Sequence, residues 1–231
     1  MRGLFVTGTD TEVGKTVLSA ALIAAISAAG EAVRAYKPVL TGLEQTAATA
    51  GGTSWPPDHE LLAHLAGMSA EEVTPLRYGP MASPHLAAQL AGERIDPEEL
   101  AARARATPAD TTLIVEGVGG VLVPLDDAYT VCDLAADLEL PLLIASRPGL
   151  GTINHTLLTL KAAREARLDV RAVVLTPWPP HPDEVLRSNR QTIERLGDVE
   201  VATLGPLAGP GVGELAEAGA TLPWRRWLDP A

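Results

Sequence analysis

One short segment near the N-terminus limits what this chain can fold into. Residues 8–16 have the sequence GTDTEVGKT and lie between the apolar run 4–6 and a helical stretch that begins near Lys15. In a loop of this kind the glycines let successive backbone N–H groups face one anion, the helix N-terminus adds partial positive charge, and the lysine adds a full charge. A simple strand-to-helix turn would not need Gly-Lys-Thr at the start of its helix. The segment therefore predicts a phosphate-binding loop, although five residues separate its glycines where about four are usual.

The loop also indicates which side chains meet a nucleotide and its metal ion. We expect Lys15 to contact the β- and γ-phosphates and the hydroxyl of Thr16 to bind Mg²⁺. The nucleotide-binding residues expected from this segment are Glu12, Val13, Gly14, Lys15, Thr16 and Val17.

Short apolar segments alternate with helical segments along the rest of the chain. Expected strands cover residues 33–37, 112–116, 140–146, 170–176 and 200–204, while expected helices begin near 58, 83 and 96 and cover 152–167 and 183–196. Four Trp, three Tyr and one Phe are the only aromatic residues, so Leu, Val, Ile and Ala must fill the core, as is typical of helices on a parallel sheet. We therefore expect an α/β fold of the P-loop NTPase kind, doubly wound, with a mostly parallel sheet and helices on both faces.

The domain organisation is simple. No internal repeat or linker divides the chain, so we expect one domain over residues 1–231. Residues 42–57 lack periodicity and predict a mobile surface loop. The apolar run 17–29 is too short to span a membrane. Trp224 and Trp227 are expected to pack against the core.

Charge and cysteine content exclude several kinds of partner. The 29 acidic and 18 basic residues give a net charge of −11 without a basic patch, so we expect no nucleic-acid and no membrane partner. The single cysteine, Cys132, permits no internal disulfide, which favours a cytoplasmic location, and we expect its thiol to be buried. His59 and His64 are five residues apart, on different faces of a helix, and do not predict a zinc site.

Three charged residues outside the loop are candidates for chemistry. Glu116 ends an otherwise apolar strand, where a carboxylate is costly unless it meets a cation, so we expect it to bind Mg²⁺ together with Thr16. Asp58 lies at the start of an expected helix, where its carboxylate would serve as an N-cap. Lys37 ends another strand, and taken alone it would be an ordinary exposed lysine.

The phosphate loop, with its Asp10-Thr11-Glu12 insert, closely resembles that of the dethiobiotin synthetase family. The resemblance continues in the same order through YKPVLTG at 36–42, SPH at 83–85, VEGVGG at 115–120 and LGTINH at 150–155. It implies a Mg²⁺-dependent cyclo-ligase that joins CO₂ to the two amines of 7,8-diaminopelargonate with ATP, through a carbamate and a carbamic-phosphoric anhydride. Chemistry of this kind depends on positioning and charge neutralisation rather than on a protein nucleophile.

The resemblance also implies roles for individual side chains. Lys15, Lys37 and Thr11 are the implied catalytic residues, with Lys37 near the γ-phosphate and the carbamate. Thr11 and Glu12 would face the γ-phosphate and the substrate amines, although solvated loop residues are an equal alternative. Thr41 would bind the carbamate beside Lys37. Asp58 would be a second Mg²⁺ ligand, with the N-cap role as an equal alternative.

Three glycines are implied to approach the ligands closely. Gly117 and Gly119 would contact the nucleotide and Gly120 the substrate. The alternative is that the three glycines only form a tight turn after Glu116.

A helix start supplies the implied site for the substrate carboxylate. Gly151, Thr152 and Asn154 would hold the carboxylate where helical N–H groups lack acceptors, unless Thr152 is an ordinary cap. In the family this site belongs to the neighbouring subunit, which implies a homodimer with active sites at its interface.

The base of the nucleotide is where the chain departs from the family. Many members have an Asn-Asp pair whose Asn contacts adenine, whereas this chain has Thr176 and Pro177 at those nucleotide-binding positions. A hydroxyl and a proline without an N–H cannot replace the donor and acceptor of a carboxamide. We therefore expect CTP and GTP to serve about as well as ATP, unless Asn189 supplies the missing carboxamide.

A partition-type regulatory ATPase on the same fold is the alternative function. Such proteins have an additional lysine in the phosphate loop, which this chain lacks, and have no use for the substrate-like segments.

Overall fold

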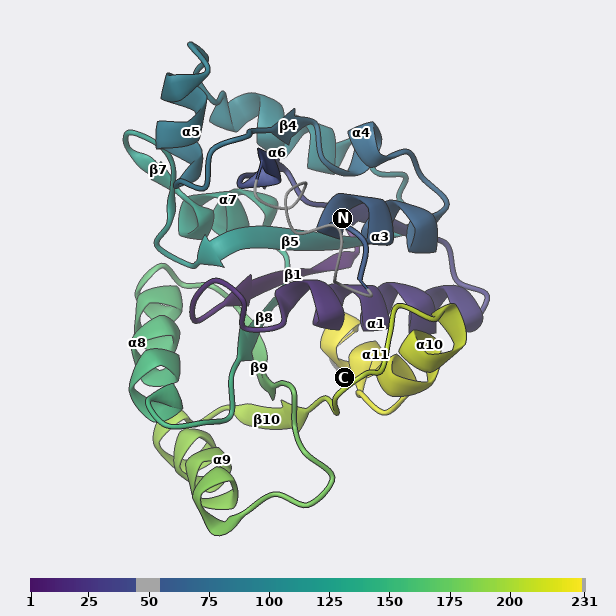
Figure 1. Cartoon of the computed structure of the whole chain (residues 1–231), viewed down its shortest axis with the longest axis vertical. Helices are drawn as coiled ribbons and strands as arrows, with labels where there is room; N and C mark the ends of the chain where they lie inside the picture. The colour runs from purple at the N-terminus through teal and green to yellow at the C-terminus, as the bar shows by residue number, and fades with distance from the viewer. Residues whose placement is uncertain (45–54, 230–231) are drawn as a thin grey trace.

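The centre of the protein is a six-stranded sheet in which every pairing is parallel. The computed structural model describes residues 1–44 and 55–229, and Figure 1 shows the sheet running through the middle of the molecule. Its strand order is β10-β9-β8-β1-β5-β2. The strands are β1 (Gly3–Gly8), β2 (Val33–Tyr36), β5 (Thr112–Gly120), β8 (Leu142–Ser146), β9 (Val170–Leu175) and β10 (Glu200–Thr203). The expected α/β fold is confirmed.

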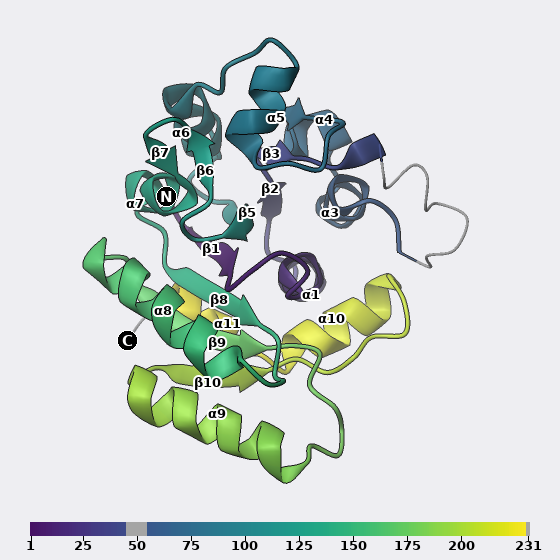
Figure 2. The same ribbon diagram turned by 60° about the vertical axis from the view of Figure 1, so that its left-hand side comes forward.

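Helices cover both faces of the sheet, and each face has its own core. Along β1, Leu4 and Val6 belong to one core and Phe5 to the other, as the two-residue period of a strand requires. The first core includes α1 (Lys15–Ala28), α3 (Asp58–Ala66), α10 (Val212–Ala220) and α11 (Trp224–Leu228). The second includes α5 (Pro84–Leu90), α6 (Pro97–Arg105), α7 (Val131–Leu138), α8 (Thr152–Glu165) and α9 (Glu184–Gly197). Figure 2 shows α8 and α9 on one side of the sheet and α1 and α10 on the other.

The predicted helix starts are confirmed, with one correction. Asp96 accepts hydrogen bonds from two first-turn amides of α6, and Ser83 precedes Pro84 at the start of α5. Helix α3 begins at Asp58, but the N-cap residue is Pro57, and the carboxylate of Asp58 binds Lys37. The N-cap alternative for Asp58 is therefore wrong.

Strand β5 is longer than the sequence predicts. It was expected to end at Glu116, yet it continues to Gly120 because Gly8 at the end of β1 still pairs with Gly120. The alternative of a tight turn directly after Glu116 is therefore wrong.

Several small elements were not predicted. They are α4 (Ala70–Val73), the parallel pair β3 (Val39–Leu40) and β4 (Leu76–Arg77), and the antiparallel pair β6 (Pro124–Asp126) and β7 (Tyr129–Thr130). Helices α7, α10 and α11 were missed as well. A signal existed for α7, because Thr130 and Asp133 form a reciprocal capping box at its start.

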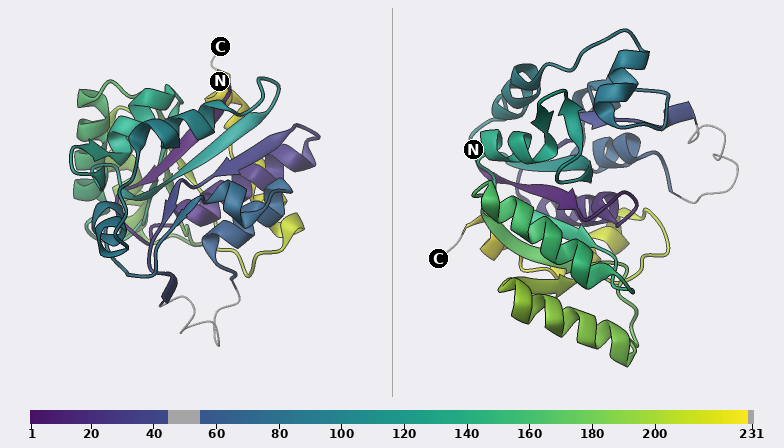
Figure 3. Two further views of the ribbon diagram at one scale, coloured as in Figure 1. Left: turned by 90° about the horizontal axis from the view of Figure 1, so that it is seen from above. Right: turned by 90° about the vertical axis from the view of Figure 1, so that its left-hand side faces the viewer.

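The first and last described residues of the chain lie close together. Nη2 of Arg2 donates a 2.9 Å hydrogen bond to Oδ2 of Asp229, and Figure 3 shows α11 close to the N-terminus. Trp224 and Trp227 are buried, as expected, and so is the free thiol of Cys132. Of the predicted loop over 42–57, residues 45–54 lie outside the described residues. Within the part of the chain that the structure describes, no helix is long and apolar enough to cross a membrane.

Candidate active site

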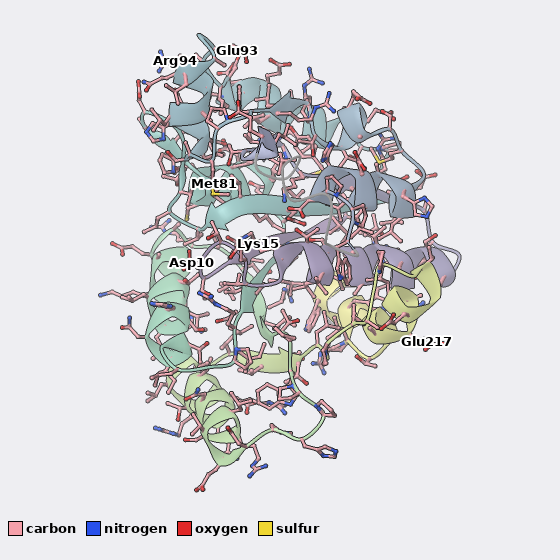
Figure 4. The ribbon with its side chains drawn as sticks, in the orientation of Figure 1. Asp10, Lys15, Met81, Glu93, Arg94 and Glu217 are labelled. Atoms are coloured by element: carbon pink, nitrogen blue, oxygen red, sulfur yellow. The ribbon has the colours of Figure 1, made fainter. Side chains whose placement is uncertain are left out.

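The phosphate loop folds tightly over the end of β1. A Cβ added to Gly8 would lie 2.7 Å from Cγ2 of Val13 and 3.1 Å from Cδ of Lys15, so a side chain there would fill the space that the loop encloses. Gly14, the N-cap residue of α1, has a φ of 91°, which favours glycine. The predicted order of strand, loop and helix is confirmed, and Figure 4 shows Asp10 and Lys15 where the loop meets α1.

The side chain of Lys15 points into the phosphate loop, and its ammonium group is poorly solvated. Its ammonium group donates a 2.8 Å hydrogen bond to the carbonyl of Asp10, and the residue is only 7% exposed. Burial lowers the pKa of Lys15, attraction to Glu116 opposes that shift, and repulsion from Lys37 adds to it. A triphosphate in the loop would supply the negative charge that this lysine lacks.

Pairing between β2 and β5 brings Lys37 to Glu116. Tyr36 is opposite Val115, so Lys37, directly after β2, lies beside Glu116, the next residue of β5. Nζ of Lys37 lies 2.7 Å from Oε1 of Glu116, and the two residues are 4% and 1% exposed. Lys37 is therefore not the exposed lysine that its sequence position alone would suggest.

Two further side chains complete this cluster. Lys37 also donates to Oδ2 of Asp58, and the hydroxyl of Thr16 donates a 2.8 Å hydrogen bond to Oε1 of Glu116. Burial opposes the charge of Lys37, but the two carboxylates outweigh burial and raise its pKa. Burial likewise opposes ionisation of Asp58, but Lys37 outweighs it and lowers the carboxyl pKa. Lys37 and Asp58 are thus both charged at neutral pH.

The cluster fits a hard divalent cation that also binds phosphate. Oε2 of Glu116 is buried and has no hydrogen-bond partner among the described residues, although a buried carboxylate oxygen normally has one. Within those residues no three His, Cys, Asp or Glu side chains form a metal cage. One or two carboxylates with a hydroxyl suit Mg²⁺, which usually keeps water and phosphate oxygens as its other ligands.

The glycines of β5 differ in what they do. A Cβ on Gly117 would lie 2.9 Å from Cγ1 of Val131 and 3.1 Å from Cε1 of Phe5, so internal packing explains this glycine. Gly119 has a φ of 63°, which favours glycine. A Cβ on Gly120 would lie 3.6 Å from the carbonyl oxygen of Gly8 and would fit. Of the three, Gly120 is the one whose missing side chain leaves room beside the phosphate loop.

The loop residues expected at the substrate are accessible. Thr11 and Glu12 are exposed, and Glu12 has a φ of 55°. The backbone N–H of Thr11 donates a 2.7 Å hydrogen bond to Oδ1 of Asp10. Thr41 is half-buried and directly follows β3. Within the described part of the chain, no hydrogen bond or ion pair joins these residues to the Lys37 cluster.

The start of α8 corrects one expectation. Gly151 is the N-cap residue with a φ of 90°, and Asn154 is exposed in the first turn. The hydroxyl of Thr152 points inwards, 2.9 Å from that of Ser146, and makes no capping bond. The capping alternative for Thr152 is therefore wrong, and a carboxylate at this site would meet backbone N–H groups rather than this hydroxyl.

The two positions expected near the base differ in their exposure. Thr176 is buried, and its Cγ2 lies 2.5 Å from where a Cβ on Gly14 would be, so the two residues fit closely. Pro177 follows it and is exposed. The amide nitrogen of Asn189 donates to the carbonyls of Pro148 and Gly149, at 3.0 and 3.4 Å. The donor that Asn189 would need for base contact is thus already used.

The fold and the phosphate loop define a P-loop nucleotide-binding protein. A family model described as "AAA domain" matches residues 2–207. ATP-dependent dethiobiotin synthetase BioD of Bacillus subtilis (strain 168) is 37% identical over 209 residues, which cover 89% of this chain and 87% of the relative. The protein of the same name from Brucella ovis is 40% identical over 196 residues, 84% of each chain. The chain belongs to the dethiobiotin synthetase family.

Among solved structures, the chain is similar to a ParA family ATPase from Chlorobium tepidum TLS. The TM-score is 0.53 with 13% sequence identity, and the match covers 98% of this chain and 94% of the other. An identity this low shows a shared fold only. It does not support the regulatory ATPase alternative over the family to which the chain belongs.

Proposed function

We propose that this chain closes the ureido ring of dethiobiotin from 7,8-diaminopelargonate, CO₂ and ATP, with Mg²⁺ at the phosphates. The observation that carries the proposal is the buried cluster of Lys37, Glu116 and Thr16 directly beside the phosphate loop. Membership in the dethiobiotin synthetase family supports the type of reaction, an ATP-dependent ring closure. The buried free cysteine suits a reducing compartment, and a cytoplasmic location remains part of the proposal.

The reaction needs charges held in place rather than a protein nucleophile. One substrate amine attacks CO₂ and loses a proton to give a carbamate, and a carbamate oxygen then displaces ADP from the γ-phosphorus. The second amine attacks the carbonyl carbon, phosphate leaves, and the ring closes with loss of a proton. Lys15 neutralises the phosphate oxygens, and Lys37 neutralises the carbamate and the transferred phosphoryl group.

Thr16 and Glu116 would hold Mg²⁺, with Asp58 as a third ligand. The unpartnered Oε2 of Glu116 supports this placement. When bound there, Mg²⁺ neutralises charge on the phosphate oxygens during phosphoryl transfer. Lys37 now pairs with both carboxylates, so metal binding would leave its ammonium group free to face the substrate.

The substrate would bind between the loop and the neighbouring strand ends. Thr11 and Thr41 face the reacting groups, and Gly120 leaves space for the diamine. The carboxylate would meet the backbone N–H groups at Gly151 and Asn154, because the N–H of Thr152 already donates to the carbonyl of Gly149 at 3.2 Å.

A homodimer with shared active sites is part of the proposal. Leu150 is 99% exposed, and Met81 and Leu122 are exposed as well, each in a segment that follows a strand. Large exposed apolar side chains of this kind favour a partner surface. Mixing inactive Lys15→Ala and Asn154→Asp subunits should restore part of the activity if each site draws on both chains. Heterodimers that form without recovery would contradict shared sites.

Weak selectivity for the base also belongs to the proposal. Thr176 packs on Gly14, and the amide of Asn189 is bound elsewhere, so neither supplies a paired donor and acceptor. Phosphate contacts then carry most of the affinity, and CTP and GTP would replace ATP.

A direct assay tests the reaction. Purified protein with diaminopelargonate, bicarbonate, ATP and Mg²⁺ should form dethiobiotin and phosphate in equal amounts. Omission of the diamine or bicarbonate should stop phosphate release. Phosphate release that is independent of the diamine would support the regulatory ATPase instead.

A further inference from the structure

The phosphate loop carries more negative than positive charge. Residues 8–16 include two acids, Asp10 and Glu12, but only one cation, Lys15, so the side chains of the loop have a net charge of −1. Positive charge near a triphosphate strengthens its binding, and negative charge weakens it. A cation from outside the loop would therefore help the loop to bind its ligand by offsetting one of the two acids.

The pairing of two neighbouring strands brings such a cation to the loop. The end of β1 pairs with the end of β8, and there the hydroxyl of Thr9 donates a 3.3 Å hydrogen bond to that of Ser146. One residue further along each segment, Nη2 of Arg147 lies 3.7 Å from Oδ2 of Asp10. Arg147 thus reaches the loop from outside it, at the edge of the sheet where the loop lies.

The polar groups of Asp10 each have a different partner. The carbonyl oxygen accepts the 2.8 Å hydrogen bond from the ammonium group of Lys15, and Oδ1 accepts a 2.7 Å hydrogen bond from the N–H of Thr11. Oδ2 is the atom that faces Arg147. An asparagine at this position would keep an oxygen for Thr11 and would lose the charge that Arg147 neutralises.

The pair formed by Arg147 and Asp10 has little to offer the fold. Its side chains are 57% and 51% exposed, and exposed ion pairs of this kind contribute little to stability. Within the described residues, Asp10 is the only ion-pair partner of Arg147. An uncompensated carboxylate in the loop, by contrast, would repel a bound triphosphate over several ångströms of water. The pair therefore matters for the ligand more than for folding.

We infer that Arg147 is a positioning residue for nucleotide binding, which neutralises and holds the carboxylate of Asp10 so that the acidic phosphate loop accepts a triphosphate. Arg147 acts through Asp10 and does not touch the phosphates. The inference rests on the proposed function only in so far as the loop is the triphosphate site.

Calorimetric titration with ATP at fixed Mg²⁺, without the diamine, tests this role. Arg147→Met should raise the Kd for ATP about fivefold, which corresponds to about 1 kcal/mol of repulsion from one uncompensated carboxylate. In an Asp10→Asn background no such charge remains, so Asp10→Asn/Arg147→Met should bind ATP within about twofold of Asp10→Asn alone. A merely structural role of Arg147 would not be rescued in this way.

The matched control is Arg94→Met. Arg94 is also exposed and forms an ion pair, at 2.9 Å with Asp126, and Figure 4 shows it well away from Lys15. Its replacement removes the same charge from the protein and should leave the Kd for ATP unchanged. Urea unfolding should be unchanged in Arg147→Met. If that variant does not fold, Arg147→Gln removes the same charge and is tested in the same titration.

The possible results separate the role of Arg147 from its alternatives. An unchanged Kd in Arg147→Met, or an equal loss in Arg94→Met, would overturn the inference. A loss that persists in the Asp10→Asn background would show that Arg147 binds phosphate directly and would overturn it as well. A Lys15→Met variant that binds ATP as tightly as wild type would contradict the triphosphate site and the inference with it. Failure to form dethiobiotin while ATP binding follows the expected pattern would contradict only the proposed reaction.

Discussion

The ammonium group of Lys37 lies 2.7 Å from Oε1 of Glu116, and both residues are buried, Lys37 directly after β2 and Glu116 within the neighbouring strand β5. Neither charge is tolerable there without the other, because a buried ion that loses its partner keeps the full cost of desolvation. The pair therefore contributes to the fold as well as to the site. Lys37 differs in this respect from Lys15, which donates its hydrogen bond to a backbone carbonyl.

Replacing the two lysines should affect stability differently. Lys37→Met should lower kcat at least about a hundredfold and the free energy of unfolding by about 3 to 5 kcal/mol, because Glu116 stays buried without its cation. Lys15→Met should lower kcat similarly with a much smaller stability change. Urea unfolding and steady-state kinetics measure both. The double variant Lys37→Met/Glu116→Gln should regain stability and remain inactive, and a double variant as unstable as Lys37→Met would contradict this account.

The two acids should differ in their effect on the metal. Glu116→Gln should raise the Mg²⁺ concentration for half-maximal activity at least about tenfold, because this carboxylate is buried beside Thr16 and has a free oxygen. Asp58→Asn should raise it less, since Asp58 is half-exposed and water can replace it. Titration of activity with Mg²⁺ at saturating ATP gives the ranking. Equal or reversed effects would show that Asp58 is the principal ligand.

Stability should depend on pH through Asp58. Its pKa in the folded protein lies below the ordinary value of 3.8, so its stabilising contribution is complete above about pH 5 and is lost as the pH falls through the folded pKa. With EDTA present, wild-type protein should therefore lose stability on acidification more steeply than Asp58→Asn. Urea unfolding from pH 7 to pH 3 measures the difference. Parallel curves for the two proteins would show that Lys37 does not stabilise the ionised carboxylate.

Two glycines of β5 should respond oppositely to alanine. Gly117→Ala should destabilise the protein by about 1 to 3 kcal/mol, because the new methyl group would crowd Val131 and Phe5. Gly120→Ala fits the structure and should leave the melting temperature nearly unchanged while it lowers kcat/KM for the diamine. Thermal unfolding and kinetics of both variants distinguish packing from ligand approach. Unchanged activity in Gly120→Ala would remove this glycine from the substrate site.

The preference among nucleotides should be weak. A paired donor and acceptor for the base is worth about 1 to 3 kcal/mol, or roughly five- to 150-fold in discrimination, and Thr176 and Pro177 do not supply one. We expect kcat/KM for ATP, CTP and GTP to be comparable at fixed Mg²⁺. A preference for ATP beyond about a hundredfold would show that another group recognises adenine.

The phosphate loop and the fold class were predictable from the sequence because their determinants are local. Residues 8–16 are consecutive, and the groups that bind phosphate belong to that one segment and to the first turn of α1. Strand and helix periods are local as well, so the alternation of segments was enough to predict a parallel sheet with helices on both faces. The capping signals at Ser83 and Asp96 placed two helix starts correctly.

Only the tertiary structure decided which residues far apart in the chain contact one another. The partners of Lys37 are 21 and 79 residues away, and those contacts exist only because β2 pairs with β5 in one register. Ser146 meets Thr9 across 137 residues because β8 lies beside β1, and Gly117 has no room for a side chain because Val131 of α7 and Phe5 of β1 lie against it. Sequence patterns report the period and polarity of a segment, whereas strand order, register and the facing side chain depend on the packing of the whole chain.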